Sequence, residues 1–444
     1  MRRPSAPMPW LIGEAMGESS LLGAYRLATR LAHPLAGPLL AWRLRRGKED
    51  GARLGERYGT PGLERPAGPL VWVHAASVGE TVSVLPLLER IVAMSAVSGL
   101  ITTGTVTSAR VAGSRLGEGL MHQFAPLDGP RFVGAFLDHW RPAAAIFAES
   151  ELWPNMILET ARRGVPLALV NARMSERSFA RWRQRGSAMA KALLGRFDVC
   201  LAQSQADADR LAVLGAAGVQ ATGNLKFDVP PPPADEAELA ALAAAIGDRP
   251  CWLAASLHPG EDAQVIAAHG KLAARFPRLV TLMAPRHPER GAEVAGRIAE
   301  AGLAPARRSV DMRPRAETDI FVMDSIGELG LAFRLAPVVL MGGSLVPHGG
   351  QNPIEAAKLE VAILHGPHVS NFAEIYAALD GESGAVRISG ADAMAGIVSD
   401  LLASPDARQA QCRAAARVLA RFAGPLDRTL TALEPILGRL PRRR

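Results

Sequence analysis

The stretch LVWVHAASVGETVSVLPLLERIVAMS, residues 70–95, decides the fold class. Residues 70–77 form a short apolar run, which predicts a buried strand. Residues 80–95 place apolar side chains at the spacing of an amphipathic helix. Between them, Ser77 is a good helix N-cap and Gly79 permits a tight turn. A strand that turns directly into a helix predicts one βα unit.

The same alternation of strand and helix repeats along the chain in two blocks. The strands predicted for the first block are 99–107, 143–150, 166–172 and 198–204. The strands predicted for the second block are 251–256, 278–284, 319–324, 337–343 and 361–366, and a mainly helical tail follows at 391–440. Repeated βα units predict an α/β fold built from parallel sheets.

Four consecutive prolines, residues 230–233, separate the two blocks and predict a stiff linker at 229–235. The predicted domains are therefore an N-terminal segment at 1–52, a Rossmann-like domain at 53–228 and a second Rossmann-like domain at 236–444. Two doubly wound domains predict a central cleft, with ligands at the carboxyl ends of the strands.

Composition narrows the class of partner. Of 444 residues, 48% are hydrophobic and only 5% aromatic, and the formal net charge is +7. A positive chain favours an anionic partner, but scattered basic residues and few aromatic ones argue against nucleic acid. Three isolated cysteines and the histidine spacing predict neither a disulfide framework nor a metal site.

The N-terminal segment contains an apolar stretch at 21–44. Basic residues lie within it or just behind it: Arg26, Arg30, Arg43, Arg45, Arg46 and Lys48. The charges and two prolines argue against a helix that spans a bilayer. Two interpretations remain open, a segment that lies on the membrane surface and a helix that covers the first domain.

Acidic side chains follow two of the strands predicted for the first domain. Glu80 lies in the first turn of the helix after 70–77, and Glu149 and Glu151 follow strand 143–150. Glu80 either complements the helix dipole or acts as a general base for a sugar hydroxyl. Lys226, just before the prolines, is either a solvated charge or a partner for a donor phosphate.

In the second domain, Arg286 follows strand 278–284 and offers a fork for a phosphate. A glycine-rich loop at 342–350 then leads to Asn352 and Pro353, a good N-cap and first helical residue. Free backbone N–H groups in such a loop bind phosphate, and Glu355 can hold ribose hydroxyls. The alternative is a plain turn.

These residues lie in motifs that resemble the 3-deoxy-D-manno-octulosonic acid (Kdo) transferases of lipopolysaccharide assembly, which have the GT-B fold. The matching segments are HAASVGE (74–80), AESELWPN (148–155), NARMSERS (171–178), GNLKFD (223–228), APRHPER (284–290), IGEL (326–329), GGSLVPHGGQNPIEAA (342–357) and HGPHVSNF (365–372). They cover almost the whole chain from about Gly55.

The resemblance implies a role for each matching position. Glu80 is the expected proton acceptor, and Glu149 and Lys226 are expected to stabilise the transition state. The expected CMP-binding set is Pro285, Arg286, Ile326, Gly327, Glu328, Asn352, Pro353, Ile354 and Glu355. Ile326 and Gln351 depart from the residues common in the family, Met and His.

The implied reaction is inverting transfer of Kdo from CMP-Kdo to a lipid A precursor, lipid IVA, at the cytoplasmic side of the inner membrane. CMP-Kdo is the donor substrate, and neither a cofactor nor a metal ion is expected. Two alternatives remain: another GT-B nucleotide-sugar enzyme, such as a UDP-sugar transferase or epimerase, and a non-catalytic protein that binds membrane surfaces.

Overall fold

The computed structural model describes residues 20–441, so residues 1–19 of the predicted N-terminal segment and the last three arginines lie outside the described part. The chain divides into two compact units. Unit 1 comprises the described residues up to Val229 together with those from Gly424 onward, and unit 2 is Pro230–Ala423. The boundary between the two units, after Val229, lies within the predicted linker at 229–235.

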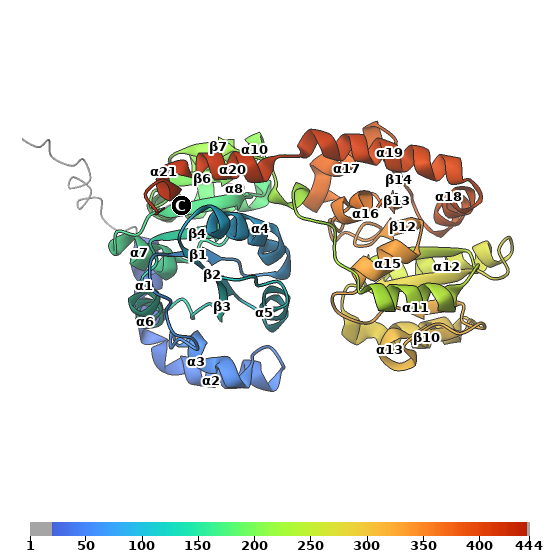
Figure 1. Cartoon of the computed structure of the whole chain (residues 1–444), viewed down its shortest axis with the longest axis horizontal. Coiled ribbons are helices and arrows are strands. Elements are labelled where there is room, and N and C mark those ends of the chain that lie inside the picture. The colour runs from blue at the N-terminus through green and yellow to red at the C-terminus, as the bar shows by residue number, and fades with distance from the viewer. Residues whose placement is uncertain (1–19, 442–444) are drawn as a thin grey trace, which may run out of the picture. The chain divides into compact units, whose positions relative to one another are not determined.

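Each unit is built around a seven-stranded parallel sheet (Figure 1). In unit 1 the strand order is β3-β2-β1-β4-β5-β6-β7. These strands are β1 (Leu70–His74), β2 (Ser98–Thr103), β3 (Leu120–Phe124), β4 (Ala144–Ala148), β5 (Leu167–Ala172), β6 (Val199–Ala202) and β7 (Val219–Ala221).

In unit 2 the strand order is β10-β11-β9-β8-β12-β13-β14. These strands are β8 (Cys251–Leu257), β9 (Val280–Pro285), β10 (Pro305–Arg307), β11 (Ile320–Val322), β12 (Val338–Met341), β13 (Ala362–His365) and β14 (Ala385–Arg387). The predicted α/β class with two doubly wound domains is confirmed.

Helices link the strands. Those of unit 1 are α1 (Ser20–Leu31), α2 (Ala36–Arg45), α3 (Leu54–Arg57), α4 (Val78–Met94), α5 (Val106–Gly113), α6 (Pro130–Trp140), α7 (Pro154–Arg162), α8 (Glu176–Arg185), α9 (Ser187–Leu194), α10 (Gln205–Val213), α20 (Pro425–Ala432) and α21 (Glu434–Leu437). Those of unit 2 are α11 (Glu236–Ile246), α12 (Glu261–Ala273), α13 (Gly291–Glu300), α14 (Arg308–Asp311), α15 (Leu329–Leu335), α16 (Ile354–Lys358), α17 (Ala373–Gly381), α18 (Ala391–Ala403) and α19 (Pro405–Phe422).

Strand β1 shows why its sequence is apolar throughout. All five of its residues are buried. Leu70 and Trp72 belong to the core on one face of the sheet, whereas Val71 and Val73 belong to the core on the other. A strand covered on both faces has no solvent side, so it carries no polar alternation.

The predicted second domain, 236–444, extends beyond unit 2 at its C-terminal end. Figure 1 shows α20 and α21, in red, among the elements of unit 1. Leu433, Ile436 and Leu440 are buried in the same core as α4. The backbone N–H groups of Gly424 and Leu426 donate to the Asp228 carboxylate, at 2.9 and 2.6 Å. Apolar burial and this cap attach the end of the chain to unit 1.

The structure agrees with one of the two interpretations left open by the sequence, a helix that covers the first domain, and the membrane interpretation stays a prediction. Helix α1 covers unit 1, since Leu22 lies in its core and the Tyr25 hydroxyl donates to Asp128 at 2.8 Å. The outward surface of the N-terminal helices remains apolar, with leucines 37–71% exposed together with Trp42. The exposed leucines are Leu21, Leu27, Leu31, Leu35, Leu39 and Leu44. In the described part of the chain, every helix is too short or too polar to span a bilayer.

Candidate functional site

Glu80 lies in the first turn of α4, where Ser77 caps the helix as predicted. The Ala76 N–H and the Ser77 hydroxyl donate to its two carboxylate oxygens, at 2.8 and 2.7 Å. Burial raises the pKa of Glu80, and the negative charges of Glu151 and Glu149 raise it further, against the two hydrogen bonds. A raised pKa suits a general base.

Glu149 follows β4 and forms an ion pair with Lys226, whose Nζ lies 2.6 Å from Oε1. The Asn171 amide donates to the same oxygen at 3.4 Å, and its own oxygen accepts the Leu225 N–H at 3.0 Å. Asn171 therefore ties Glu149 to the short segment that carries Lys226. The structure brings together two residues that are 77 positions apart.

Glu149 and Asn171 both have left-handed backbone conformations, each with φ of 51°. Such a conformation costs a non-glycine residue on the order of 1–3 kcal/mol. Strain of this kind persists only where surrounding contacts enforce it, and it is frequent at functional sites. Glu149 directly follows β4 and Asn171 is the penultimate residue of the neighbouring strand β5, so both lie at the edge of the sheet where Glu80 lies.

Glu151 completes the acidic group. Burial alone would raise its pKa, but interactions with His74 and a hydrogen bond from the Trp153 indole outweigh burial and lower it. The Nε2 atom of buried His74 lies 3.6 Å from the Glu151 carboxylate and has no hydrogen-bond partner within residues 20–441. Sequence reasoning gave no role to His74. Its position at the end of an apolar strand was the available signal.

In unit 2, the predicted CMP-binding residues follow three strands at one edge of the sheet. Pro285 ends β9 and is buried, while the Arg286 side chain is exposed. Ile326 and Gly327 follow β11, and Ile326 is 50% exposed. Glu328 binds Arg308 with both oxygens, at 2.8 and 2.9 Å. Hydrogen bonding from Arg308 is the largest cause of a lowered Glu328 pKa, so this carboxylate is held within the protein.

The helix that follows Asn352 begins one residue later than predicted. Helix α16 begins at Ile354, so Pro353 is the N-cap. The Asn352 side chain still accepts the Ile354 N–H at 3.1 Å and lies 3.5 Å from the Glu355 carboxylate. The helix has only five residues. Its dipole at a bound phosphate is therefore weaker than that of a long helix.

The prediction that the glycine loop presents free N–H groups is wrong for its first half. The N–H groups of Gly343, Ser344 and Leu345 donate to the Glu261 carboxylate at 2.7–3.0 Å. The His258 N–H donates to it at 2.8 Å, and the Glu261 side chain is fully buried. A buried carboxylate needs such donors. Glu261 therefore fixes the loop from inside, a role that sequence reasoning missed.

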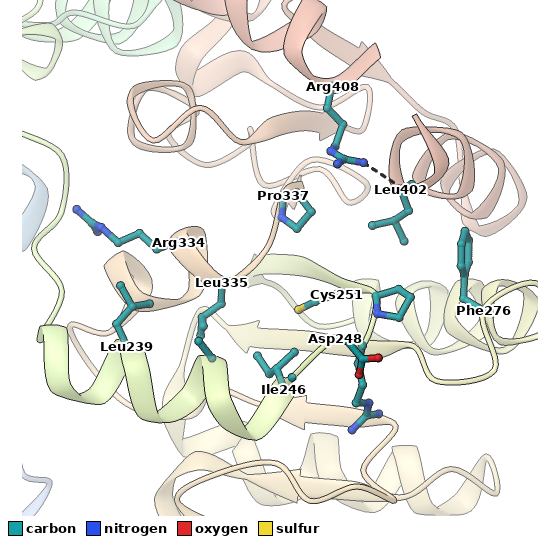
Figure 2. Close-up of a pocket in the computed structure, with 14 residues that line it drawn as sticks. Leu239, Ile246, Asp248, Cys251, Phe276, Arg334, Leu335, Pro337, Leu402 and Arg408 are labelled. Carbon is teal, nitrogen blue, oxygen red and sulfur yellow. Dashed lines mark hydrogen bonds between the residues drawn. The ribbon is translucent and has the colours of Figure 1, made fainter. Parts of the chain in front are cut away.

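A separate pocket of about 560 Å³ lies at the opposite edge of the same sheet (Figure 2). Cys251 at the start of β8 and Pro337 just before β12 line it, together with Leu239, Leu335 and Phe276. Ligands of doubly wound sheets bind at the carboxyl ends of the strands. This pocket lies at the amino ends, away from every predicted site residue of unit 2.

No three His, Cys, Asp or Glu side chains within residues 20–441 are placed to hold a metal ion. In unit 1 the candidate site is a group of three carboxylates and one lysine. In unit 2 it is a set of loops held by Glu261 and Arg308. The first group suits proton transfer and charge stabilisation, and the loops suit binding of a phosphorylated ligand.

Comparison with known proteins agrees with this chemistry. The family model for 3-deoxy-D-manno-octulosonic-acid transferase (kdotransferase) matches residues 52–229. The 3-deoxy-D-manno-octulosonic acid transferase of Bordetella pertussis is 37% identical over 433 residues, covering 94% of this chain and 99% of that one. The enzyme of the same name from Haemophilus influenzae is 34% identical over 393 residues, covering 87% and 92%.

A solved glycosyltransferase from Rickettsia africae shares the fold at 10% identity, with a TM-score of 0.56 over 84% of this chain and 100% of that one. Likeness at this level shows the fold alone, and it confirms the predicted GT-B class. Since relatives are matched over almost their whole length, the chain belongs to the family of 3-deoxy-D-manno-octulosonic acid transferases, which are glycosyltransferases.

Proposed function

We propose that this protein transfers Kdo from CMP-Kdo to a lipid A precursor, lipid IVA, with inversion at the anomeric carbon. Membership of the family supports Kdo as the sugar that is transferred. The observation that carries the mechanism is the half-buried Glu80 carboxylate after β1, held by the Ala76 N–H and the Ser77 hydroxyl in the first turn of α4. A half-buried carboxylate with a raised pKa is a stronger base than an exposed one.

In the proposed reaction an acceptor hydroxyl oxygen attacks the anomeric carbon of Kdo from the face opposite CMP. The hydroxyl proton passes to Glu80, and the bond between the anomeric carbon and the phosphate oxygen breaks. CMP leaves with that electron pair. A single displacement inverts the configuration, through a transition state with oxocarbenium character.

In the proposed mechanism, Glu149 and Lys226 stabilise the charge that develops in the transition state. Their ion pair holds both side chains in place, with exposed fractions of only 15% and 20%. In such a partly buried setting, fixed charges stabilise a developing charge better than water does, because they need no reorganisation. Lys226 supplies the positive charge, and Glu149 orients it.

In unit 2, Pro285, Arg286, residues 326–328 and residues 352–355 bind CMP in this proposal. Arg286 supports the assignment because its guanidinium is exposed and forms no ion pair with any described residue. The leaving group is a monophosphate, so no pyrophosphate requires a metal ion. We propose metal-independent transfer without a cofactor.

We also propose that the enzyme works at the cytoplasmic face of the inner membrane. The exposed leucines of α1 and α2 support membrane contact. The basic charge available there is smaller than the sequence suggested, because Arg26 is buried against Glu159 and Arg43 pairs with Glu49. Arg30, Arg45, Arg46 and Lys48 remain exposed and can contact anionic lipid.

Donor discrimination tests the function. CMP, UMP and UDP are titrated into the full-length protein with EDTA present, and transfer is then measured with CMP-Kdo and with UDP-sugars. We expect CMP to bind more tightly than UMP or UDP, and only CMP-Kdo to give product. Preference for UDP, or turnover of a UDP-sugar, would identify a different GT-B enzyme.

A further inference from the structure

Three histidines outside the predicted site residues lie together in unit 2. The ring of His258, which follows β8, stacks on the ring of His348, which follows β12, at 4.1 Å and 18° between planes. The ring of His287, which follows β9, meets His258 edge-on at 6.2 Å and 89°. Three separate loops therefore contribute one imidazole each to a group that we name the histidine cluster.

The histidine cluster lies where open α/β sheets bind ligands. Strand β8 is the first strand of unit 2 in the chain, and its neighbours in the sheet are β9 on one side and β12 on the other. The chain therefore reverses its direction of travel across the sheet at β8. Ligands bind at the carboxyl ends of strands next to such a switch point.

Two arginines lie around the histidine cluster, and most of the nearby carboxylates are already held by other partners. Arg286 directly precedes His287, and Arg290 lies close by but is balanced by Asp262 and Glu293, at 2.9 and 3.1 Å. The only carboxylate of the described residues that forms an ion pair with the cluster is exposed Glu289, 3.7 Å from His287. The nearby carboxylate of Glu261 is already engaged by four backbone N–H groups.

The geometry favours an anion over a metal ion. Stacked rings direct their nitrogen lone pairs side by side and not toward one point. The Gln351 amide nitrogen lies 3.1 Å from Nε2 of His258. Because an amide N–H donates, Nε2 accepts, and the proton of the neutral ring is then on Nδ1.

We propose that the histidine cluster, together with Arg286, binds an anionic oxygen group of the sugar-nucleotide donor, and that it binds this group together with a proton. The inference rests on the proposed function, because the anion is either the phosphate or the sugar carboxylate of the donor. It adds His258, His287 and His348 to the residues that recognise this donor.

Electrostatics explains why binding of the anion is expected to protonate His258. Burial is the largest cause of the lowered His258 pKa, which is about 4. The remaining causes are the positive charges of its neighbours, His348, His287, Arg286 and Arg290. The free His258 ring is thus neutral at pH 7. A bound anion favours the imidazolium, so it raises this pKa. Binding then takes up a proton and strengthens as the pH falls.

An NMR titration of the full-length protein tests the inference. The ring signal of His258 is assigned by its loss in the His258→Asn variant and followed from pH 4 to pH 8 with no ligand, with cytidine, with CMP, and with CMP plus free Kdo. We expect the titration midpoint to rise by at least one pH unit, which is a tenfold change in proton affinity. A rise with CMP but not with cytidine identifies the phosphate as the ligand group, and a rise only after Kdo is added identifies the carboxylate.

A variant provides an independent measurement. His348 is exposed, so His348→Asn should fold normally, and it should weaken anion binding at pH 6 by about tenfold. The matched control is His139→Asn, a partly exposed histidine of unit 1, which should bind as the parent does.

Three results would overturn the inference. The first is a His258 midpoint that stays unchanged while CMP and Kdo demonstrably bind. The second is equal binding by His348→Asn and the parent. The third is tight binding of Zn²⁺ to the cluster that CMP and Kdo do not affect. If CMP does not bind at all, the proposed function fails as well, and the absence of binding heat distinguishes that case.

Discussion

At the scale of single residues, two neighbouring carboxylates of unit 1, Glu80 and Glu151, have pKa values shifted in opposite directions. Interactions with His74 and Trp153 keep Glu151 ionised, and its charge raises the pKa of Glu80. Environments that move the pKa values of two acids in opposite directions are typical of acid–base catalysis. In the proposed mechanism, Glu80 is therefore the member of the group that exchanges a proton.

The first prediction concerns Glu80→Gln. We expect transfer to fall at least about a hundredfold, since general-base contributions are about 10²–10⁴-fold. In the parent, kcat/KM should fall as the pH drops through the raised pKa of Glu80, because protonation removes the base. That acid limb should be absent from the residual activity of the variant.

Stability provides the control for this variant. A carboxyl whose pKa is raised by folding binds its proton more tightly in the folded chain, so its ionisation at pH 7 lowers the free energy of unfolding. Glutamine removes this cost. The Tm of Glu80→Gln at pH 7 should equal or exceed that of the parent. A stable variant with unchanged kcat/KM would make Glu80 a helix-end charge only.

The second prediction concerns the pair Glu149–Lys226. Lys226→Met leaves a partly buried carboxylate without its ammonium partner, which we expect to cost on the order of 1–3 kcal/mol of stability. The double variant Lys226→Met/Glu149→Gln should recover most of that loss. Transfer should fall at least about tenfold in both, because the positive charge is absent in both. Recovered activity in the double variant would show that the pair is structural only.

The sequence predicted some of these residues, but it did not predict the contacts that hold them in place. Glu80 was predictable because a strand, a cap and a helix lie within a few residues of it. The Asn171 amide donates to Glu149 and the Leu225 N–H donates to Asn171 only because β4 and β5 align with the short segment that carries Lys226, and no local pattern encodes this alignment. The same holds for Glu261, which accepts from a loop more than eighty positions away.

At the scale of elements, the sequence did not predict four of the strands, β3, β7, β10 and β14. They are the two edges of each sheet. β7, β10 and β14 have only three residues each, and β3 contains His122 and Gln123. An edge strand is less fully covered, so its apolar pattern is weaker. The central strands were predicted because burial on both faces demands apolar sequence.

The third prediction belongs to the loop that Glu261 holds. In Glu261→Gln an amide NH₂ faces two of the backbone N–H groups and cannot accept from them. We expect the KM for the donor to rise at least about tenfold, with a smaller change in kcat, because in the proposed mechanism the loop binds the donor and does no chemistry.

The matched control is Glu300→Gln, an exposed glutamate at the end of α13. It should keep the parent KM and Tm. If Glu261→Gln lowers the Tm but leaves the donor KM unchanged, the loop has no part in donor binding.

At the scale of the whole molecule, the N-terminal helices are part of unit 1 and at the same time its most apolar surface. Removing them would expose core around Leu22 and leave Glu159 without Arg26. We therefore expect truncation of the N-terminal helices to disturb folding. Surface substitutions test membrane binding without this complication.

The fourth prediction uses the triple variant Leu27→Ser/Leu31→Ser/Leu35→Ser, whose side chains are 58–71% exposed. Burying one leucine contributes on the order of 1.5–3 kcal/mol, so the triple variant should bind vesicles with anionic lipid at least about tenfold less tightly. Sedimentation with vesicles measures this, and high salt should also release the parent in part.

The control is Val213→Ser, which removes an apolar side chain of similar exposure, 65%, at the end of α10. It should bind vesicles as the parent does. Equal binding by the triple variant would show that α1 and α2 do not contact the membrane.

Product analysis tests the central claim most directly. Full-length protein is incubated with CMP-Kdo and lipid IVA in detergent with EDTA, and the lipid is examined by mass spectrometry. The acceptor should gain the mass of one or more Kdo residues, and CMP should be released in equal number. Glu80→Gln should give at most about a hundredth of this product in the same time. An acceptor of unchanged mass, with CMP-Kdo intact, would contradict this claim.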